Sequence, residues 1–132
     1  MHITLESDYA IRIVLYLAQN RKRVEAKNIA DQTEVTLRFA LKILRKLVAS
    51  EIVRSFKGTQ GGYELNKEPE EITLADIIQT VEGTYYLSRC LDPAQGCNRE
   101  QKLPYCKVQQ EFAKISVYVQ ERLNEITIAT LI

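Results

Sequence analysis

All three cysteines of this 132-residue sequence, Cys90, Cys97 and Cys106, lie in one polar stretch that reads CLDPAQGCNREQKLPYC. Thiolate sulfur is a soft, strongly donating ligand for metals such as iron and zinc, and thiols are also readily oxidised. The spacing C-x6-C-x8-C is too wide for a CxxC zinc knuckle, and no histidine lies nearby. An odd number of cysteines argues against a disulfide framework and favours metal binding, redox chemistry or plain packing.

The composition is that of an ordinary globular chain that needs no cross-links. Hydrophobic residues make up 45% and charged residues 27% of the sequence, and a chain of this length can bury a core as one compact domain. The longest apolar run, AIRIVLYLA, contains Arg12 and is too short to cross a bilayer or to act as a signal peptide. We therefore expect a cytoplasmic protein that does not contact a membrane.

Charge is distributed unevenly along the chain, although the total is only +1. Residues 21–58 contain ten Lys or Arg and four Asp or Glu, a net charge of +6, whereas residues 1–20 and 59–132 sum to −1 and −4. A basic segment between acidic flanks favours a local anion-binding face. A solvated surface without a partner is the other interpretation of charge alone.

Three stretches carry apolar residues at the i, i+3, i+4, i+7 spacing of a helix with one buried face. These residues are Ala10, Ile13, Val14 and Leu17, then Ala40, Ile43, Leu44 and Leu47, and then Leu74, Ile77, Ile78 and Val81. Residues 25–32 are expected to form a short helix, which a polar turn at Thr33 and Glu34 joins to the second of these stretches. The order is helix, tight turn, helix.

Two short β-prone runs, residues 52–56 and 63–65, follow the second periodic helix. They are joined by a turn with three glycines, and glycine supplies the positive φ values that tight hairpins require. The sequence therefore predicts a mainly α fold with a small two-stranded wing, which is a winged helix-turn-helix.

A fourth helix is expected over residues 107–125, at the end of the chain. Its apolar residues are spaced four, three, four and four apart, which is typical of a coiled-coil seam. They are Val108, Phe112, Ile115, Val119 and Leu123. The seam can pack on its own domain, but a long amphipathic helix at a chain end favours an interface between two chains.

The helix expected over residues 36–49 has a basic side opposite its apolar side. At 100° per residue, Arg38, Lys42 and Arg45 fall close together on the exposed face. Such a helix fits the major groove of double-stranded DNA, where its first residues reach base edges and longer cations reach phosphates. Thr36 and Arg38 are the candidates for base contact, Phe39 can touch a thymine methyl group, and Lys42 and Arg45 would position the helix.

The tip of the predicted wing carries three further candidates for DNA contact. Lys57, Thr59 and Gln60 would lie beside the adjacent minor groove or backbone. If the basic face instead meets an acidic protein, the chain is a winged-helix protein-interaction module.

Five segments, in order, read SDYAIRIVLYLA, VTLRFALKILRKLVASEIVRS, KGTQGGYEL, ITLADIIQTVEG and RCLDPAQGC. This ordered set resembles the Rrf2 family of bacterial winged-helix transcriptional regulators, of the IscR, NsrR, RirA and CymR type. The resemblance covers nearly the whole chain. It implies a homodimer joined by the C-terminal helix and bound to an imperfect palindrome. It divides the chain into a DNA-binding domain with its following helix (1–83), a cysteine-containing sensor loop (84–106) and a dimerisation helix with a tail (107–132).

In that family, three cysteines of this loop hold a two-iron two-sulfur or four-iron four-sulfur cluster. The resemblance therefore implies that Cys90, Cys97 and Cys106 are cluster ligands. IscR-type members add a histidine at the position of Gln109, whereas some NsrR-type members add an acidic residue at the position of Asp8, reaching over from the partner subunit. By the residues alone, Asp8 is also a favourable first-turn carboxylate for its own helix.

Three positions depart from the family pattern. Lys57 stands where the wing commonly has arginine. The positive charge is kept, but the two parallel hydrogen bonds that a guanidinium can donate are lost. Leu41 stands where IscR carries an acidic residue involved in site choice, so the target sequence of IscR is not transferred. Glu51 replaces the glycine that usually ends the recognition helix, and a left-handed backbone there would cost about 1 kcal/mol.

The sequence therefore predicts a DNA-binding regulator that senses iron-sulfur status, nitric oxide or redox state. The open alternatives for the thiols are a cluster-free thiol-disulfide switch and a structural zinc site. Enzyme function is not expected, because the sequence has no nucleophile elbow, phosphate-binding loop or histidine-containing catalytic set.

Overall fold

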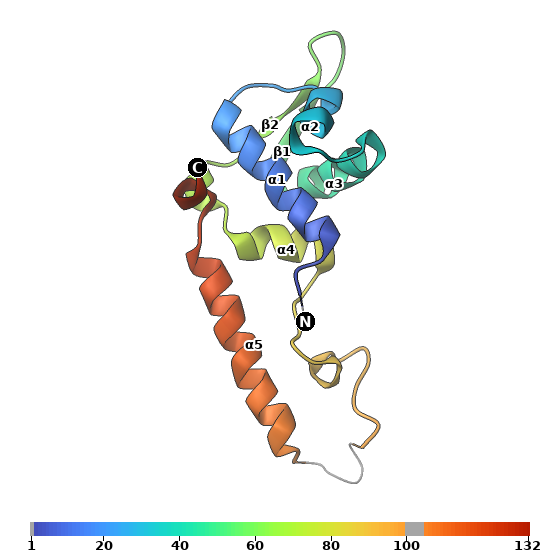
Figure 1. Ribbon diagram of the computed structural model, residues 1–132, viewed down its shortest axis with the longest axis vertical. Coiled ribbons are helices and arrows are strands. Elements are labelled where there is room, and N and C mark those ends of the chain that lie inside the picture. Colours follow the sequence, from blue (N-terminus) through green and yellow to red (C-terminus); the bar gives the residue numbers. More distant parts are fainter. Residues whose placement is uncertain (1, 100–104) are drawn as a thin grey trace.

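The computed structural model describes residues 2–99 and 105–132, and it has a helical head from which one long helix extends (Figure 1). The head contains four helices and a hairpin: α1 (Leu5–Asn20), α2 (Ala26–Thr33), α3 (Leu37–Ala49), β1 (Val53–Phe56), β2 (Gly62–Leu65) and α4 (Leu74–Glu82). The long helix is α5 (Lys107–Glu125). The predicted winged helix-turn-helix fold with a long C-terminal helix is confirmed.

One hydrophobic core lies between α1, α3 and α4 and is built from the predicted apolar faces. Eleven of the twelve periodic residues are buried, and Leu74 is partly buried against them. Thr4, Thr36 and Thr73 cap the three helices, since each hydroxyl accepts a hydrogen bond from the backbone three residues on. These caps explain where each helix begins.

Glu51, which stands where the family usually has glycine, has a left-handed backbone with φ of +63°. The residue directly follows the end of α3, where the chain turns sharply toward β1. Its carbonyl accepts a hydrogen bond from the Asn66 side chain at 3.0 Å. A residue with a side chain is strained in this conformation, whereas glycine is not. Glu51→Gly is therefore compatible with the turn.

The wing is an antiparallel hairpin in which Val53 pairs with Leu65 and Phe56 with Gly62. It is joined to the loop between α1 and α2 because Val24 and Tyr63 exchange two backbone hydrogen bonds of 2.9 Å. Gly62 has φ of +145°, and a Cβ atom there would lie 2.8 Å from the Val24 carbonyl oxygen. The close approach of loop and wing therefore requires glycine at this position.

The end of the chain returns to the head beyond α5. Thr127 bridges Thr73, and the backbone nitrogen of Ile128 donates to the Ile72 carbonyl at 2.8 Å. Ile128 is fully buried in the head core, which is worth roughly 1.5–3 kcal/mol relative to an exposed side chain. The tail thus fixes the C-terminal end of α5 to the helical head.

Most of α5 lies outside the core. Ser116 is its one buried residue. Of the five predicted seam residues, Val108, Phe112 and Ile115 are 60%, 36% and 46% exposed, whereas Val119 and Leu123, nearer the head, are half-buried. An exposed apolar stripe over the first half of a helix is unusual where it faces only solvent. No helix in the described part of the chain is both long enough and apolar enough to cross a membrane.

Candidate DNA-binding face and cysteine segment

The predicted basic stripe lies on the exposed side of α3. Arg38, Phe39, Leu41, Lys42 and Arg45 line one shallow hollow in the surface. Within residues 2–99 and 105–132, neither Arg38 nor Arg45 makes a salt bridge. Two cations without carboxylate partners, projecting from one helix face, form a surface suited to a polyanion.

Thr36, Arg38 and Phe39, the three residues predicted to lie near bases, are at the N-terminal end of α3. Thr36 uses its oxygen to accept the cap hydrogen bond from the Phe39 backbone at 3.3 Å, which leaves its hydroxyl hydrogen free to donate. Phe39 is 44% exposed, and its ring packs edge-on against Tyr9 with centroids 6.1 Å apart. The side chain of Phe39 is thereby held in place while much of it faces outward.

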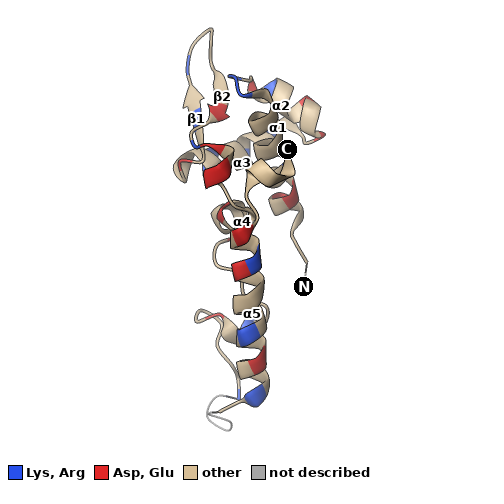
Figure 2. Ribbon diagram, turned by 90° about the vertical axis from the view of Figure 1, so that its left-hand side faces the viewer, with Lys and Arg blue, Asp and Glu red and all other residues tan. Residues whose placement is uncertain are grey.

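The wing tip is exposed, as the sequence predicted for Lys57, Thr59 and Gln60. Figure 2 shows Lys and Arg on the wing and on the loop that leads into α2.

Two arginines that the sequence did not single out contact the aromatic ring of Phe56 in the wing. The guanidinium carbon of Arg23 lies 3.4 Å from the ring centroid, and that of Arg54 lies 5.7 Å away. No periodicity signals the contact of Arg23, because it joins a loop to a strand. Arg54 lies two residues before Phe56 in β1, on the same face of the strand.

Lys42 and Lys46 of α3 share the carboxylate of Glu6, at the start of α1. The Glu6 oxygen lies 2.8 Å from Lys46 Nζ and 3.5 Å from Lys42 Nζ. Lys46 also donates to the Val81 carbonyl at the end of α4, at 3.2 Å. The hydrogen bond from Lys46, together with the positive charge of both lysines, lowers the pKa of Glu6 against an opposing effect of partial burial. This contact joins the recognition helix to α1 and α4.

The three cysteines are free thiols, each of intermediate exposure. Cys90 lies in the short 3-10 helix η2 (Arg89–Leu91), with its sulfur 3.3 Å from the Ser88 hydroxyl. Cys97 accepts from the Arg99 backbone at 3.3 Å. Cys106 is the N-cap of α5, and its sulfur accepts from the Gln109 backbone at 3.5 Å.

The predicted ligands are not gathered into a metal site within one chain. Among the described residues, no group of three His, Cys, Asp or Glu side chains could hold a metal ion. Asp8 lies on the first turn of α1, where its carboxylate pairs with Arg12 at 2.7 Å. The donor set is chemically suited to iron or zinc, but the thiols would have to move closer together to share one metal.

One side of α5 holds the segment before the cysteines by three side-chain hydrogen bonds to backbone groups. Gln120 donates to the Tyr85 carbonyl at 2.7 Å, Ser116 accepts from the Leu87 nitrogen at 2.9 Å, and Gln109 donates to the Cys90 carbonyl at 2.9 Å. We refer to Gln109, Ser116 and Gln120 as the polar stripe. The sequence analysis missed it, because its partners are backbone groups of an irregular segment.

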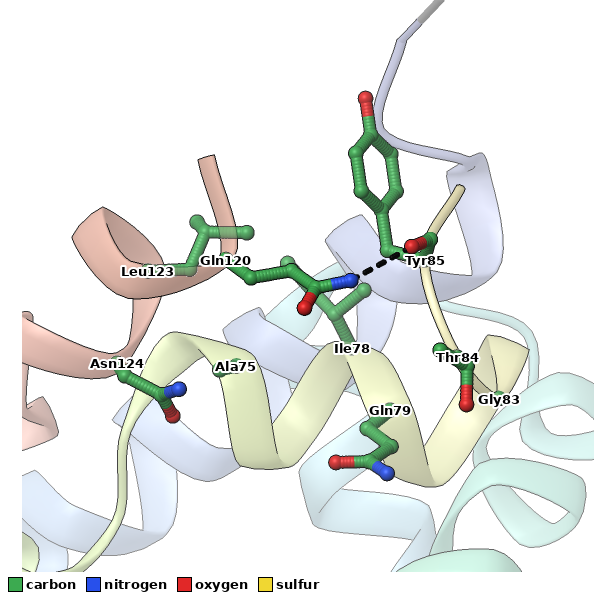
Figure 3. A pocket seen from close by; sticks show the side chains of 9 residues that line it. All are labelled: Ala75, Ile78, Gln79, Gly83, Thr84, Tyr85, Gln120, Leu123 and Asn124. Carbon is green, nitrogen blue, oxygen red and sulfur yellow. Dashed lines mark hydrogen bonds between the residues drawn. The ribbon is translucent and has the colours of Figure 1, made fainter. Parts of the chain in front are cut away.

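A small pocket lies where the polar stripe meets α4 (Figure 3). Ala75 and Ile78 of α4 face Gln120 and Leu123 of α5 across it. The hydrogen bond from Gln120 to Tyr85 closes one side of this pocket. The junction between α4 and α5 is therefore partly apolar and partly hydrogen-bonded.

Comparison with known proteins identifies the family. The Rrf2 sequence profile, described as "Iron-dependent Transcriptional regulator", matches residues 3–132. The chain belongs to the Rrf2 family. It is 33% identical over 125 residues to an HTH-type transcriptional regulator of Aquifex aeolicus, covering 94% of this chain and 86% of that one.

Two further Rrf2-type proteins resemble this chain. The HTH-type transcriptional regulator NsrR of Shouchella clausii is 31% identical over 94 residues, which span 70% of this chain and 63% of the relative. The solved structure of T. potens IscR superposes with a TM-score of 0.77 over 99% of this chain and 85% of that one, at 23% identity, a likeness that concerns the fold. The protein is thus a winged-helix transcriptional regulator of a family whose members are not enzymes.

The contact between Glu6 and Lys46 predicts a pH-dependent contribution to stability. Because the pKa of Glu6 in the folded chain lies below its ordinary value of 4.5, the charged carboxylate favours the folded state above that pH. The contribution is lost as the pH falls through the folded-state pKa. Glu6→Gln should lower the free energy of unfolding by at most about 1 kcal/mol at pH 7, because the pair is partly exposed.

Urea unfolding of both proteins between pH 7 and pH 3.5 measures this difference. The gap between the wild type and Glu6→Gln should narrow below the ordinary pKa of glutamate. The exposed Glu111 of α5 provides the control, Glu111→Gln, which should show a smaller gap at neutral pH. If the difference in the free energy of unfolding between the wild type and Glu6→Gln stayed constant with pH, this interpretation would be contradicted.

Proposed function

We propose that this Rrf2 regulator binds an imperfect palindrome in double-stranded DNA as a homodimer and senses iron-sulfur status, nitric oxide or redox state through its cysteine segment. The observation that carries the DNA-binding part is the exposed face of α3, with Arg38 and Arg45 free of salt bridges in the described chain. A bacterial regulator of this kind acts in the cytoplasm, where the DNA lies.

In this proposal, α3 enters the major groove with its N-terminal end toward the bases. Thr36 and Arg38 contact base edges, and Phe39 contacts a thymine methyl group. Lys42 and Arg45 lie further along the same face and contact phosphates, which fix the helix in register. The wing residues Lys57, Thr59 and Gln60 contact the backbone or the minor groove beside the half-site.

The homodimer is proposed to form through the exposed seam of α5. Burial of such a stripe against a second copy is the ordinary way to remove it from water. The polar stripe occupies a neighbouring face of the same helix, so it leaves the exposed seam residues Val108, Phe112 and Ile115 free. Two heads related by a twofold axis would present their recognition helices to two half-sites. The centres of such half-sites lie one turn of DNA, about 34–36 Å, or a multiple of it apart.

An iron-sulfur cluster is proposed to be held by Cys90, Cys97 and Cys106. Support comes from three free, partly exposed thiols in one segment, from the family's description as iron-dependent, and from the preference of iron for soft thiolate ligands. When bound, such a cluster supplies redox chemistry and reactivity toward oxygen or nitric oxide. The proposed fourth ligand is Asp8 of the partner subunit, since the side-chain nitrogen of Gln109 is engaged with the Cys90 carbonyl.

The polar stripe gives the cysteine segment a physical connection to the proposed dimer helix. A change in how the cysteines are ligated or oxidised alters the backbone near Cys90, whose carbonyl accepts from Gln109 of α5. Ser116 and Gln120 hold the same segment further along. A small movement of α5 in each subunit would change the spacing of the two recognition helices and so remove contacts at one half-site.

The DNA-binding part is tested by salt dependence and by substitutions on α3. Duplexes that the wild type selects from a random library serve as probes, with an unrelated duplex beside them. The logarithm of affinity should fall linearly with the logarithm of salt, with a slope of about −0.9 per phosphate neutralised. Arg45→Met should make this slope shallower by about 0.9 on every duplex, whereas Arg38→Met should lose about 1–3 kcal/mol on the selected duplex alone.

Lys114→Met removes the same charge from the side of α5 opposite the seam, away from the DNA-binding face, and is the matched control. It should leave both the salt slope and the preference for the selected duplex nearly unchanged. A wild-type affinity that does not change with salt would instead favour the protein-interaction module. If Arg45→Met and Lys114→Met had equal effects, α3 would not be the DNA-binding helix.

The metal-binding part is tested on protein purified without oxygen, by absorption spectroscopy with iron, sulfide and zinc counts. Iron and sulfide in equal amounts are expected, and Cys97→Ser should abolish both. Zinc without sulfide would support the structural zinc alternative. Metal-free protein whose DNA affinity changes with reductant would support the thiol-disulfide switch.

The role of Asp8 is tested by Asp8→Ala with Asp31→Ala as the matched acidic control on α2. Asp8→Ala should change the spectrum or shorten the lifetime of the cluster, and Asp31→Ala should not. Heterodimers of an Asp8→Ala chain with a Cys97→Ser chain contain one complete site only if the ligand crosses between subunits. If Asp8→Ala had the same spectrum as the wild type, Asp8 would not be a ligand of the cluster.

A further inference from the structure

Arg23 lies at the point where the loop after α1 meets the wing. Its guanidinium carbon is 3.4 Å from the ring centroid of Phe56, the last residue of β1. One guanidinium nitrogen also approaches the backbone carbonyl of Gln60 at the wing tip, at 3.5 Å. A guanidinium stacked on an aromatic ring keeps its plane fixed while its edges remain able to donate hydrogen bonds.

The backbone on both sides of this contact is held in place. Val24, directly after Arg23, pairs with Tyr63 of β2 through two hydrogen bonds of 2.9 Å. Gly62 permits that approach because a side chain there would collide with the Val24 carbonyl. Arg23 is therefore attached to the wing, although it lies about thirty residues before it in the sequence.

The charge of Arg23 is available to an external partner. Two neighbouring arginines are already paired: Arg21 contacts Glu68, and Arg54 lies 2.6 Å from Glu64. Arg23 is exposed, and within the described ranges it makes no salt bridge. Its position beside Lys57, Thr59 and Gln60 places a fixed, unpaired cation at the proposed DNA-binding edge of the wing.

We propose that Arg23 contacts a DNA phosphate beside the wing and is held ready for it by Phe56. This inference rests on the proposed DNA binding and adds a residue from outside the α3 face and the hairpin tip. Lys57 supplies a point charge at the wing but no planar fork. The guanidinium of Arg23 supplies that fork, and little conformational freedom is lost on binding because stacking has already ordered it.

The test compares Arg23→Met, which keeps the aliphatic stem but loses the charge, with Arg21→Met on the same loop. The probes are the duplex selected by the wild type and an unrelated duplex. Arg23→Met should weaken binding to both duplexes by roughly three- to tenfold and make the salt slope shallower by about 0.9. Arg21→Met should leave the slope unchanged, and Arg23→Lys should keep the wild-type slope with an intermediate affinity.

Urea unfolding establishes that each variant is folded before its binding is measured. If Arg23→Met and Arg21→Met both had the same salt slope as the wild type, the proposal that Arg23 contacts a phosphate would be wrong. A loss confined to the selected duplex would also overturn it, in favour of an arginine that reads a minor-groove edge. If the wild type itself bound no duplex in a salt-dependent manner, the proposed function would fail independently of Arg23.

Discussion

The apolar seam of α5 is the constraint on which the proposed organisation depends. Of the 19 residues of α5, Ser116 alone is buried, so the rest of the chain covers little of the surface of this helix. Its exposed Val108, Phe112 and Ile115 lie on one side, while Gln109, Ser116 and Gln120 lie on another and are occupied by the backbone of the preceding segment. In the proposed dimer, the seam faces the second copy and the polar stripe faces the cysteine segment.

Both ends of α5 are attached to the parts that the proposal connects. At its start, Cys106 caps the helix and Gln109 holds the carbonyl of Cys90. Beyond its end, the tail enters the head core through Ile128. The short network of Glu6, Lys46 and the Val81 carbonyl then joins α4 to the recognition helix. A contiguous set of packed and hydrogen-bonded groups therefore runs from the cysteines to α3.

The regular elements could be predicted from the sequence because they follow local patterns. Apolar spacing identified α1, α3, α4 and α5, and the wing followed from two β-prone runs around a glycine turn. The sequence marked Glu51 only as a residue in place of the family's usual glycine, and its left-handed backbone is known from the structure. The exposed face of α3 followed from the same helical period.

The contacts between elements could not be predicted in this way. The stacking of Arg23 on Phe56 joins a loop to a distant strand, and the polar stripe binds backbone carbonyls that have no sequence signature. The pairing of Lys42 and Lys46 with Glu6 likewise depends on how α1 crosses α3. The placement of the three cysteines relative to one another depends on an irregular loop, for which periodicity gives no information.

Sedimentation equilibrium of seam variants tests the dimer most directly. Ile115 lies on the seam and is 46% exposed, whereas Val117 is 52% exposed and faces the opposite side of α5. Ile115→Glu would place a charge in the proposed interface and should give monomers at micromolar concentration, while the wild type and Val117→Glu remain dimers. A wild-type protein that sediments as a monomer, or an Ile115→Glu protein that remains as dimeric as Val117→Glu, would contradict the account.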